Sequence, residues 1–101
     1  MFRRDKLAAS DVAKVSSAES FAEQACTPAR MEQGVDELFI KTGNELHMRG
    51  VAKLIKWVQG DIVAEEADTL RANGLTPRDI AKPVSAVVRE WFTQRMQEGK
   101  R

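Results

Sequence analysis

Few residues in this chain combine a type and a spacing that catalysis or metal binding would need. His47 is the only histidine and Cys26 the only cysteine, so no pair of such ligands exists to hold a metal ion. Glu65 and Glu66 are adjacent, and neighbours on a helix point about 100° apart, so their carboxylates cannot act together on one bond. We therefore expect a non-enzymatic protein with no catalytic residue, no metal site and no cofactor.

The other chemical candidates have simpler structural interpretations. Cys26 has no activating group close to it in the sequence, which favours a small buried side chain near a helix end over a nucleophile. The six glycines are dispersed, and none is followed by Lys-Ser or Lys-Thr, so no phosphate-binding loop is indicated. Without a reaction to assign, binding is the expected activity.

Charge is ordered along residues 49–68. Arg49, Lys53 and Lys56 come first, and a mainly acidic stretch follows. A helix dipole favours the reverse order, with acids at the start and bases at the end. An antiparallel second copy would set each basic half against an acidic half, so the order predicts a two-fold symmetric homodimer. The alternative is a solvated face whose charges pair with other helices of the same chain. The predicted partner or dimer interface comprises Arg49, Val51, Lys53, Lys56, Trp57, Gly60, Asp61, Glu65 and Glu66.

Two function classes follow from these features. The first is a small regulator, inhibitor or adaptor that presents an amphipathic helical surface to a protein partner. The alternative is a small dimeric nucleic-acid-binding regulator that uses its basic termini and the helix predicted over 77–96. Steep salt dependence would distinguish phosphate binding from an apolar helix contact. The possible nucleic-acid contacts are Arg3, Arg4, Lys6, Arg78, Lys82, Arg89 and Arg95.

The helices that must position these residues meet at a corner within residues 73–80. Gly74 suits the left-handed conformation that ends a helix. Thr76 is a good N-cap for the next helix, and Leu75 and Ile80 stand where a hydrophobic staple would join them. This stretch predicts two helices connected by a tight turn.

Helical periodicity covers most of the chain, and no run alternates with the period of two that is typical of strands. The predicted fold is all-α, a small bundle of about four helices, either compact or interlocked as a homodimer. We expect the helices over residues 10–26, 28–42, 45–73 and 77–96. A bend or close contact is expected at Gly60, a kink or split at Pro83, and Val15 on the apolar face of the first helix. The expected core comprises Leu54, Ile55, Val58, Ile62, Val84, Val88 and Trp91.

The composition is that of one folded domain over residues 1–101, with 1–9 as a flexible basic arm and 97–101 as a flexible tail. Charged residues make up 31% and apolar residues 43% of the chain, which is too apolar for a disordered protein. The formal net charge of +1 argues neither for nor against nucleic acid. The single cysteine and the lack of a long apolar run near the N-terminus predict a cytoplasmic protein without a membrane span.

Overall fold

The computed structural model describes residues 9–40 and 48–99, and within them the side chains of 13–39 and 49–98. These residues are 91% helical and include no strand, which confirms the all-α fold. No helix among them has the length and apolar character needed to cross a membrane. In chain order the elements are α1 (Ala9–Ala25), α2 (Pro28–Val35), a π-helical turn η2 (Asp36–Ile40), a 3₁₀ turn η3 (Met48–Gly50), α3 (Val51–Glu65), α4 (Ala67–Ala72) and α5 (Pro77–Gly99).

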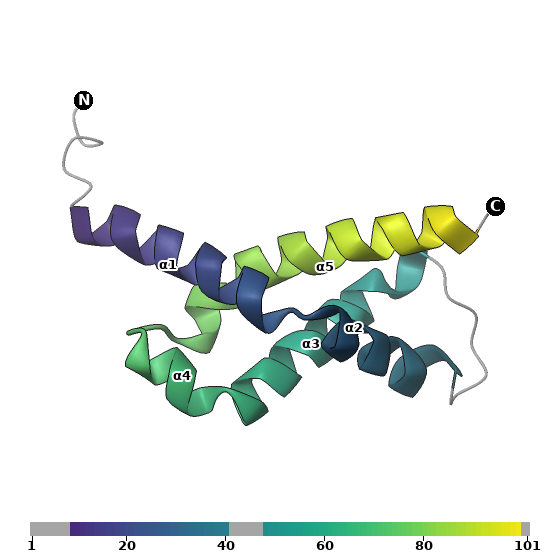
Figure 1. The fold of residues 1–101 in the computed structure, drawn as a ribbon, viewed down its shortest axis with the longest axis horizontal. Coiled ribbons are helices and arrows are strands. Elements are labelled where there is room, and N and C mark those ends of the chain that lie inside the picture. The colour runs from purple at the N-terminus through teal and green to yellow at the C-terminus, as the bar shows by residue number, and fades with distance from the viewer. Residues whose placement is uncertain (1–8, 41–47, 100–101) are drawn as a thin grey trace.

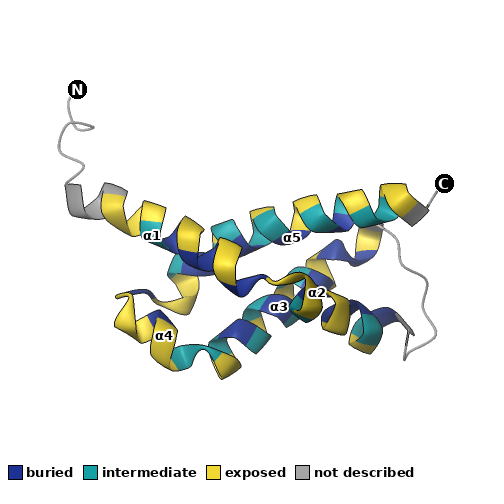
Figure 2. Cartoon of the chain, viewed as in Figure 1, coloured by how far each residue is buried: buried dark blue, intermediate teal, exposed yellow. Residues whose placement is uncertain are grey.

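The helices form two layers (Figure 1). Helices α3 and α5 form one layer and pack against each other. Helices α1 and α2 form the other layer, in which α1 crosses α5 and α2 lies against α3. The buried positions concentrate where these helices face one another, so a single apolar core lies between the layers (Figure 2). The short helix α4 connects the end of α3 to the start of α5 and reaches this core through Leu70.

The core contains most of the residues predicted for it. Ile55 and Trp91 are only partly buried and pack at its margin, so these two predictions are half right. The prediction for Val15 is wrong, since its side chain is 59% exposed. Helix α1 turns its small side chains inward instead, with Ala22 completely buried. The predicted residues that have no exposed surface are Leu54, Val58, Ile62, Val84 and Val88.

Gly74 ends the turn after α4 in the predicted left-handed conformation, with φ +70°. Its N–H donates to the Arg71 carbonyl at 2.9 Å, and the N–H of Leu75 donates to the Leu70 carbonyl at 3.0 Å. This is the Schellman arrangement, which satisfies carbonyls that a helix end leaves unpaired. Leu70 and Leu75 are both buried, so the turn is anchored to the core.

Thr76 caps α5 through reciprocal hydrogen bonds with Asp79. The Asp79 N–H donates to Thr76 Oγ1 at 3.3 Å, and the Thr76 N–H donates to Asp79 Oδ2 at 2.8 Å. The Thr76 N–H, helped by Lys14 Nζ at 3.3 Å, holds the pKa of Asp79 below its ordinary value. Leu75 and Ile80 flank the cap and are both buried, as the hydrophobic staple predicts.

Thr76→Ala should lower the free energy of unfolding by about 1 kcal/mol, because the first turn of α5 loses its cap. Urea denaturation followed by circular dichroism measures the change. Thr69→Ala is the control, since Thr69 is exposed within α4 and caps no helix; its effect should stay within about 0.5 kcal/mol. Equal effects of the two substitutions would contradict the capping role of Thr76.

The prediction of one continuous helix over residues 45–73 is wrong. A bend at Glu66 separates α3 from α4, so the described residues form five α-helices rather than four. Glu66 leaves helical geometry at φ −115° and ψ 25°, and its carboxylate pairs with Arg30. The bend lets Leu70 return to the core instead of continuing past it. The boundary expected between residues 42 and 45 lies outside the described residues.

Neither Pro83 nor Gly60 interrupts its helix. Helix α5 runs unbroken through Pro83, so the split is wrong and the kink stays a prediction; the buried stripe on both sides outweighs the one hydrogen bond that proline removes. The same helix reaches Gly99, within the tail expected over 97–101. Gly60 is exposed, and a Cβ atom there would meet nothing within 4 Å, so the close contact expected at Gly60 is also wrong. The close approach occurs at Gly34 instead.

Candidate functional site

The first of two rows of basic side chains lies on α3 and the turn before it. Arg49, Lys53 and Lys56 are spaced four and three residues apart, which places them on one side of a helix. All three are exposed. The opposite side of α3 carries Val58, which is completely buried. Packing of the apolar stripe therefore turns this row toward solvent.

The second row lies on α5. Arg78, Lys82 and Arg89 are separated by four and seven residues, so they too share one side of their helix. All three are exposed, while Val84 on the other side is completely buried. Arg89 Nε donates to Ser85 Oγ at 3.2 Å, which keeps the guanidinium along the helix surface.

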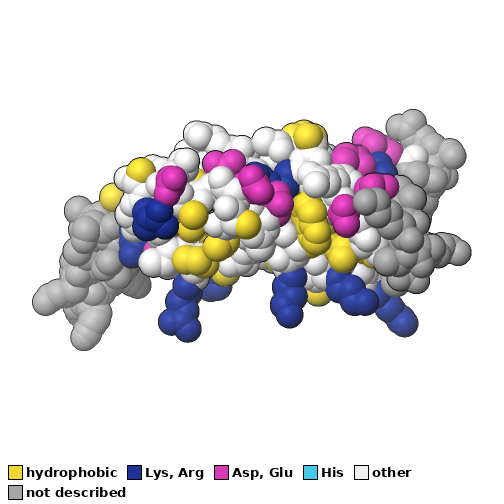
Figure 3. Space-filling view, turned by 90° about the horizontal axis from the view of Figure 1, so that it is seen from below, with side chains coloured by type: hydrophobic (Ala, Val, Ile, Leu, Met, Phe, Trp, Pro, Cys, Tyr) yellow, Lys and Arg dark blue, Asp and Glu magenta, His cyan; other side chains and the backbone are white. Residues whose placement is uncertain are grey.

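The two rows are left on the same side of the molecule. Helices α3 and α5 pack against each other, α2 lies against α3, and α1 lies against α5, where Lys82 borders the groove between α1 and α5. Gln59 Nε2 donates to the Pro77 carbonyl at 2.9 Å and ties the two helices together. Figure 3 shows Lys and Arg side chains projecting along one edge of the molecule, with no Asp or Glu between them. We call the two rows together the basic face; it comprises Arg49, Lys53, Lys56, Arg78, Lys82 and Arg89.

No described carboxylate lies within ion-pair distance of the basic face. The other described cations do have such partners: Lys14 pairs with Asp79 at 3.3 Å, and Arg71 pairs with Asp68. Arg30 and Arg95 also bind carboxylates. The described part of the chain thus neutralises its other cations and leaves those of the basic face to solvent or to a partner.

The predicted nucleic-acid contacts divide into three groups. Arg78, Lys82 and Arg89 belong to the basic face. Arg95 does not, since it pairs with Glu32 at 3.2 Å and lies over the Trp91 ring at 5.7 Å. The remaining three, Arg3, Arg4 and Lys6, fall outside the described residues.

The predicted dimer interface is not gathered on one surface. Its three bases, Arg49, Lys53 and Lys56, lie on the basic face, whereas Asp61 and Glu66 turn to Arg30 of the same chain. These two acids therefore pair with a cation of the same chain, which was the alternative to the dimer. The homodimer stays a prediction, with less of its acidic half free to meet a second copy.

The apolar members of that interface are also occupied within the chain. Val51 is buried in the core, and the Trp57 ring packs against Gly34 of α2. Gly60 and Glu65 are exposed. Most apolar contacts that a dimer through α3 would need are therefore already used by the fold.

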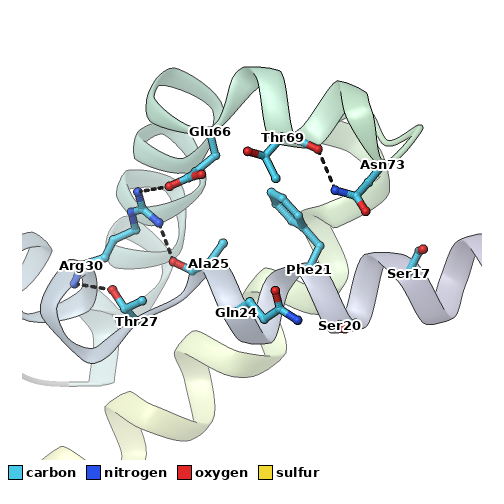
Figure 4. Close-up of a pocket in the computed structure, with 10 residues that line it drawn as sticks. All are labelled: Ser17, Ser20, Phe21, Gln24, Ala25, Thr27, Arg30, Glu66, Thr69 and Asn73. Atoms are coloured by element: carbon cyan, nitrogen blue, oxygen red, sulfur yellow. Dashed lines mark hydrogen bonds and ion pairs between the residues drawn. The ribbon is translucent and has the colours of Figure 1, made fainter.

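Arg30 joins the end of α1, the start of α2 and the bend after α3 (Figure 4). Its Nε donates to Asp61 Oδ2 at 2.7 Å, a second nitrogen donates to Glu66 Oε2 at 3.4 Å, and a third to the Ala25 carbonyl at 2.5 Å. Burial alone would lower the pKa of Arg30, but the bonds and charges of Asp61 and Glu66 together raise it above its ordinary value. Sequence analysis missed Arg30, because its partners lie 31 and 36 residues away.

Beside Arg30 a recess of about 310 Å³ opens between α1 and α4 (Figure 4). Its two charged groups, Arg30 and Glu66, bind each other, and the Asn73 amide donates to the carbonyl of Thr69 in its own helix at 2.8 Å. The recess therefore offers neutral hydroxyl and amide groups around an aromatic ring, and no reactive group. It is lined by Ser17, Ser20, Phe21, Gln24, Ala25, Thr27, Arg30, Glu66, Thr69 and Asn73.

Cys26 is poorly suited to nucleophilic chemistry. Its side chain is buried, and burial raises the pKa of the thiol to about 11 despite the nearby charge of Arg30. The thiol is therefore protonated at neutral pH, whereas the thiolate is the nucleophile. His47 lies outside the described residues. Within the described part of the chain, no three His, Cys, Asp or Glu side chains are gathered so that they could hold a metal ion.

No family model, no curated protein and no solved structure matches this chain. The basic face and the charges around it are therefore the features of this protein from which a function can be inferred.

Proposed function

We propose that this protein binds nucleic acid through the basic face. The observation that carries the proposal is the set of six exposed cations, each without a described carboxylate partner, on one side of two packed helices. Phosphate backbones are the partners that such a surface attracts most strongly, because each cation can displace a counterion from the nucleic acid. The proposed activity is binding, through which a small protein could act as a regulator.

Charge separation supports this choice over a random scatter of surface charges. Several acidic side chains are held by cations outside the basic face: Asp61 and Glu66 at Arg30, and Glu32 at Arg95. The basic face can therefore produce a positive local field although the net charge of the whole chain is only +1.

A protein partner that binds an apolar helical surface is the second candidate. Among the described side chains, Val15 is the one large hydrophobic residue that is exposed. It borders a groove between α1 and α5 that is lined by Ala18, Pro83 and Ala86 and by the charged side chains of Glu19, Asp79 and Lys82. The apolar part of this groove is limited, because the apolar stripes of the helices are used by the core.

The proposal is tested by fluorescence anisotropy with a labelled DNA duplex of about 20 base pairs, titrated between about 50 and 200 mM salt. If all six cations contact phosphates, the logarithm of the binding constant should fall against the logarithm of salt concentration with a slope of about −5. The variant Lys53→Gln with Lys56→Gln should weaken binding about tenfold or more and reduce the slope by roughly two.

The matched control is Arg71→Gln with Arg95→Gln, which removes the same charge from two cations outside the basic face. We expect this control to bind within about threefold of the unmodified protein if the contacts are local. Equal weakening by both pairs of substitutions, or no binding at the lowest salt, would reject the proposal. The groove at Val15 would then be the surface to probe, with Val15→Asp as the first variant.

A further inference from the structure

The geometry of the basic face points to its ligand class, and we infer that it binds double-stranded nucleic acid by the phosphate backbone without reading the bases. This inference rests on the proposed function and adds to it the form of the nucleic acid. Three features of the described residues carry it: the two-row layout, the absence of a stacking surface, and the width of the helix pair.

The cations form two rows that match the two strands of a duplex. Packed helices lie about 8–10 Å apart, and the grooves between duplex strands are about 6 and 12 Å wide. At 1.5 Å per residue, the row from Arg49 to Lys56 is about 10 Å long and the row from Arg78 to Arg89 about 16 Å. Phosphates recur about every 3.4 Å along each strand, so each row can meet several of them. A single strand would offer phosphates to one row only.

The basic face has no aromatic surface on which unpaired bases could stack. Trp57 packs against Gly34 of α2, and the ring of Trp91 lies under Arg95. The described phenylalanines, Phe21, Phe39 and Phe92, are all buried. Proteins that bind single strands combine cations with aromatic side chains that stack on the bases. The basic face lacks such aromatic side chains. It therefore favours double-stranded nucleic acid, in which the bases are already stacked on one another.

The two rows can be used together only when the helix pair lies across the backbones, where their Arg and Lys side chains meet phosphates rather than base edges. A single helix fits the major groove, which is about 12 Å wide, whereas two packed helices of about 10 Å each are too broad to enter together. Two uncharged polar groups near the cations are engaged: Gln59 binds the Pro77 carbonyl, and Ser85 accepts from Arg89. The helix pair therefore lies across the backbones, and binding should be independent of sequence.

The experiment compares a labelled duplex of about 20 base pairs with each of its separated strands and with an oligo(dT) of equal length, at about 100 mM salt. We expect the duplex to bind at least tenfold more tightly than any single strand. A second duplex of different base composition should bind within about threefold of the first, because phosphate contacts carry no sequence information.

Two variants each remove cations from one row: Lys53→Gln with Lys56→Gln on α3, and Arg78→Gln with Arg89→Gln on α5. Each should weaken duplex binding about tenfold and reduce the salt slope by roughly two. The control Arg71→Gln with Arg95→Gln, at two cations outside both rows, should leave both values nearly unchanged. Because all the substituted side chains of the two rows are exposed, circular dichroism should show an unaltered helical fold.

The outcomes separate this inference from the proposed function. Tighter binding to a single strand, a preference above tenfold between the two duplexes, or loss from only one row would overturn the inference while leaving nucleic-acid binding in place. Failure to bind any of the probes would overturn the proposed function itself.

Discussion

Phe92→Ala should lower the free energy of unfolding by about 3–5 kcal/mol. Phe92 is the largest side chain with no exposed surface, and its ring lies against that of Phe39 at a centroid distance of 6.3 Å and a tilt of 44°. Its removal would leave a cavity between α5 and the segment after α2. The Phe39 ring cannot move far to fill this cavity, because it is also in close contact with Gly50. Urea denaturation measures the loss.

The size of this effect can be judged against an exposed apolar residue. Val15→Ala removes apolar atoms from a side chain that is 59% exposed, so it should change stability by no more than about 0.5 kcal/mol. A small domain is stable by only about 5–15 kcal/mol, so Phe92→Ala should also lower the melting temperature by more than 10 °C, at roughly 4–8 °C per kcal/mol. A loss below about 1 kcal/mol would mean that Phe92 is not enclosed by the core.

The same substitution at two glycines should have opposite effects. At Gly34, an added Cβ atom would lie 2.7 Å from Leu54 Cδ1 and 2.8 Å from Trp57 Cε3, so Gly34→Ala should destabilise the protein by about 1–3 kcal/mol through overpacking. At Gly60, a Cβ atom would meet nothing within 4 Å. Gly60→Ala should stabilise α3 by about 0.5–1 kcal/mol, since alanine loses less backbone entropy in a helix.

Denaturation of the two glycine variants side by side gives the measurement, and a double mutant identifies the cause. If the clash at Gly34 is steric, adding Trp57→Leu should recover part of the loss, so the two substitutions would not be additive. Stabilisation by Gly34→Ala, or additive effects with Trp57→Leu, would show that α2 and α3 are not in tight contact at this point.

Interactions between residues close in the chain were predictable from the sequence. The corner at Gly74 and Thr76 forms with the expected left-handed turn and cap, and Thr27 caps α2 by accepting from the Arg30 N–H at 3.1 Å. Each of these contacts joins residues three to five positions apart, so the residue types and their spacing suffice to predict them. The apolar stripes of α3 and α5 were predictable for the same reason, because helical spacing repeats locally.

Only the tertiary structure decided how these helices use their remaining surfaces. Periodicity cannot tell an exposed glycine from one against a neighbouring helix, so the close approach was expected at Gly60 and occurs at Gly34. The bend at Glu66 and the pairing of Asp61 depend on Arg30, which is more than 30 residues away in the chain. Local sequence carries no signal for such distant partners.

The cations of the candidate site could be predicted from the sequence, but their grouping on one surface could not. Both rows of cations could be found, but the row with Lys53 was assigned to a dimer and the row with Arg89 to nucleic acid. Packing of α3 against α5 brings the two rows onto neighbouring helices, and the described ion pairs of the chain are made by its other cations. Sequence determines which side of each helix is charged, because that depends on spacing along one helix. Which helices lie side by side depends on how the apolar stripes are buried together, and only the folded chain decides it.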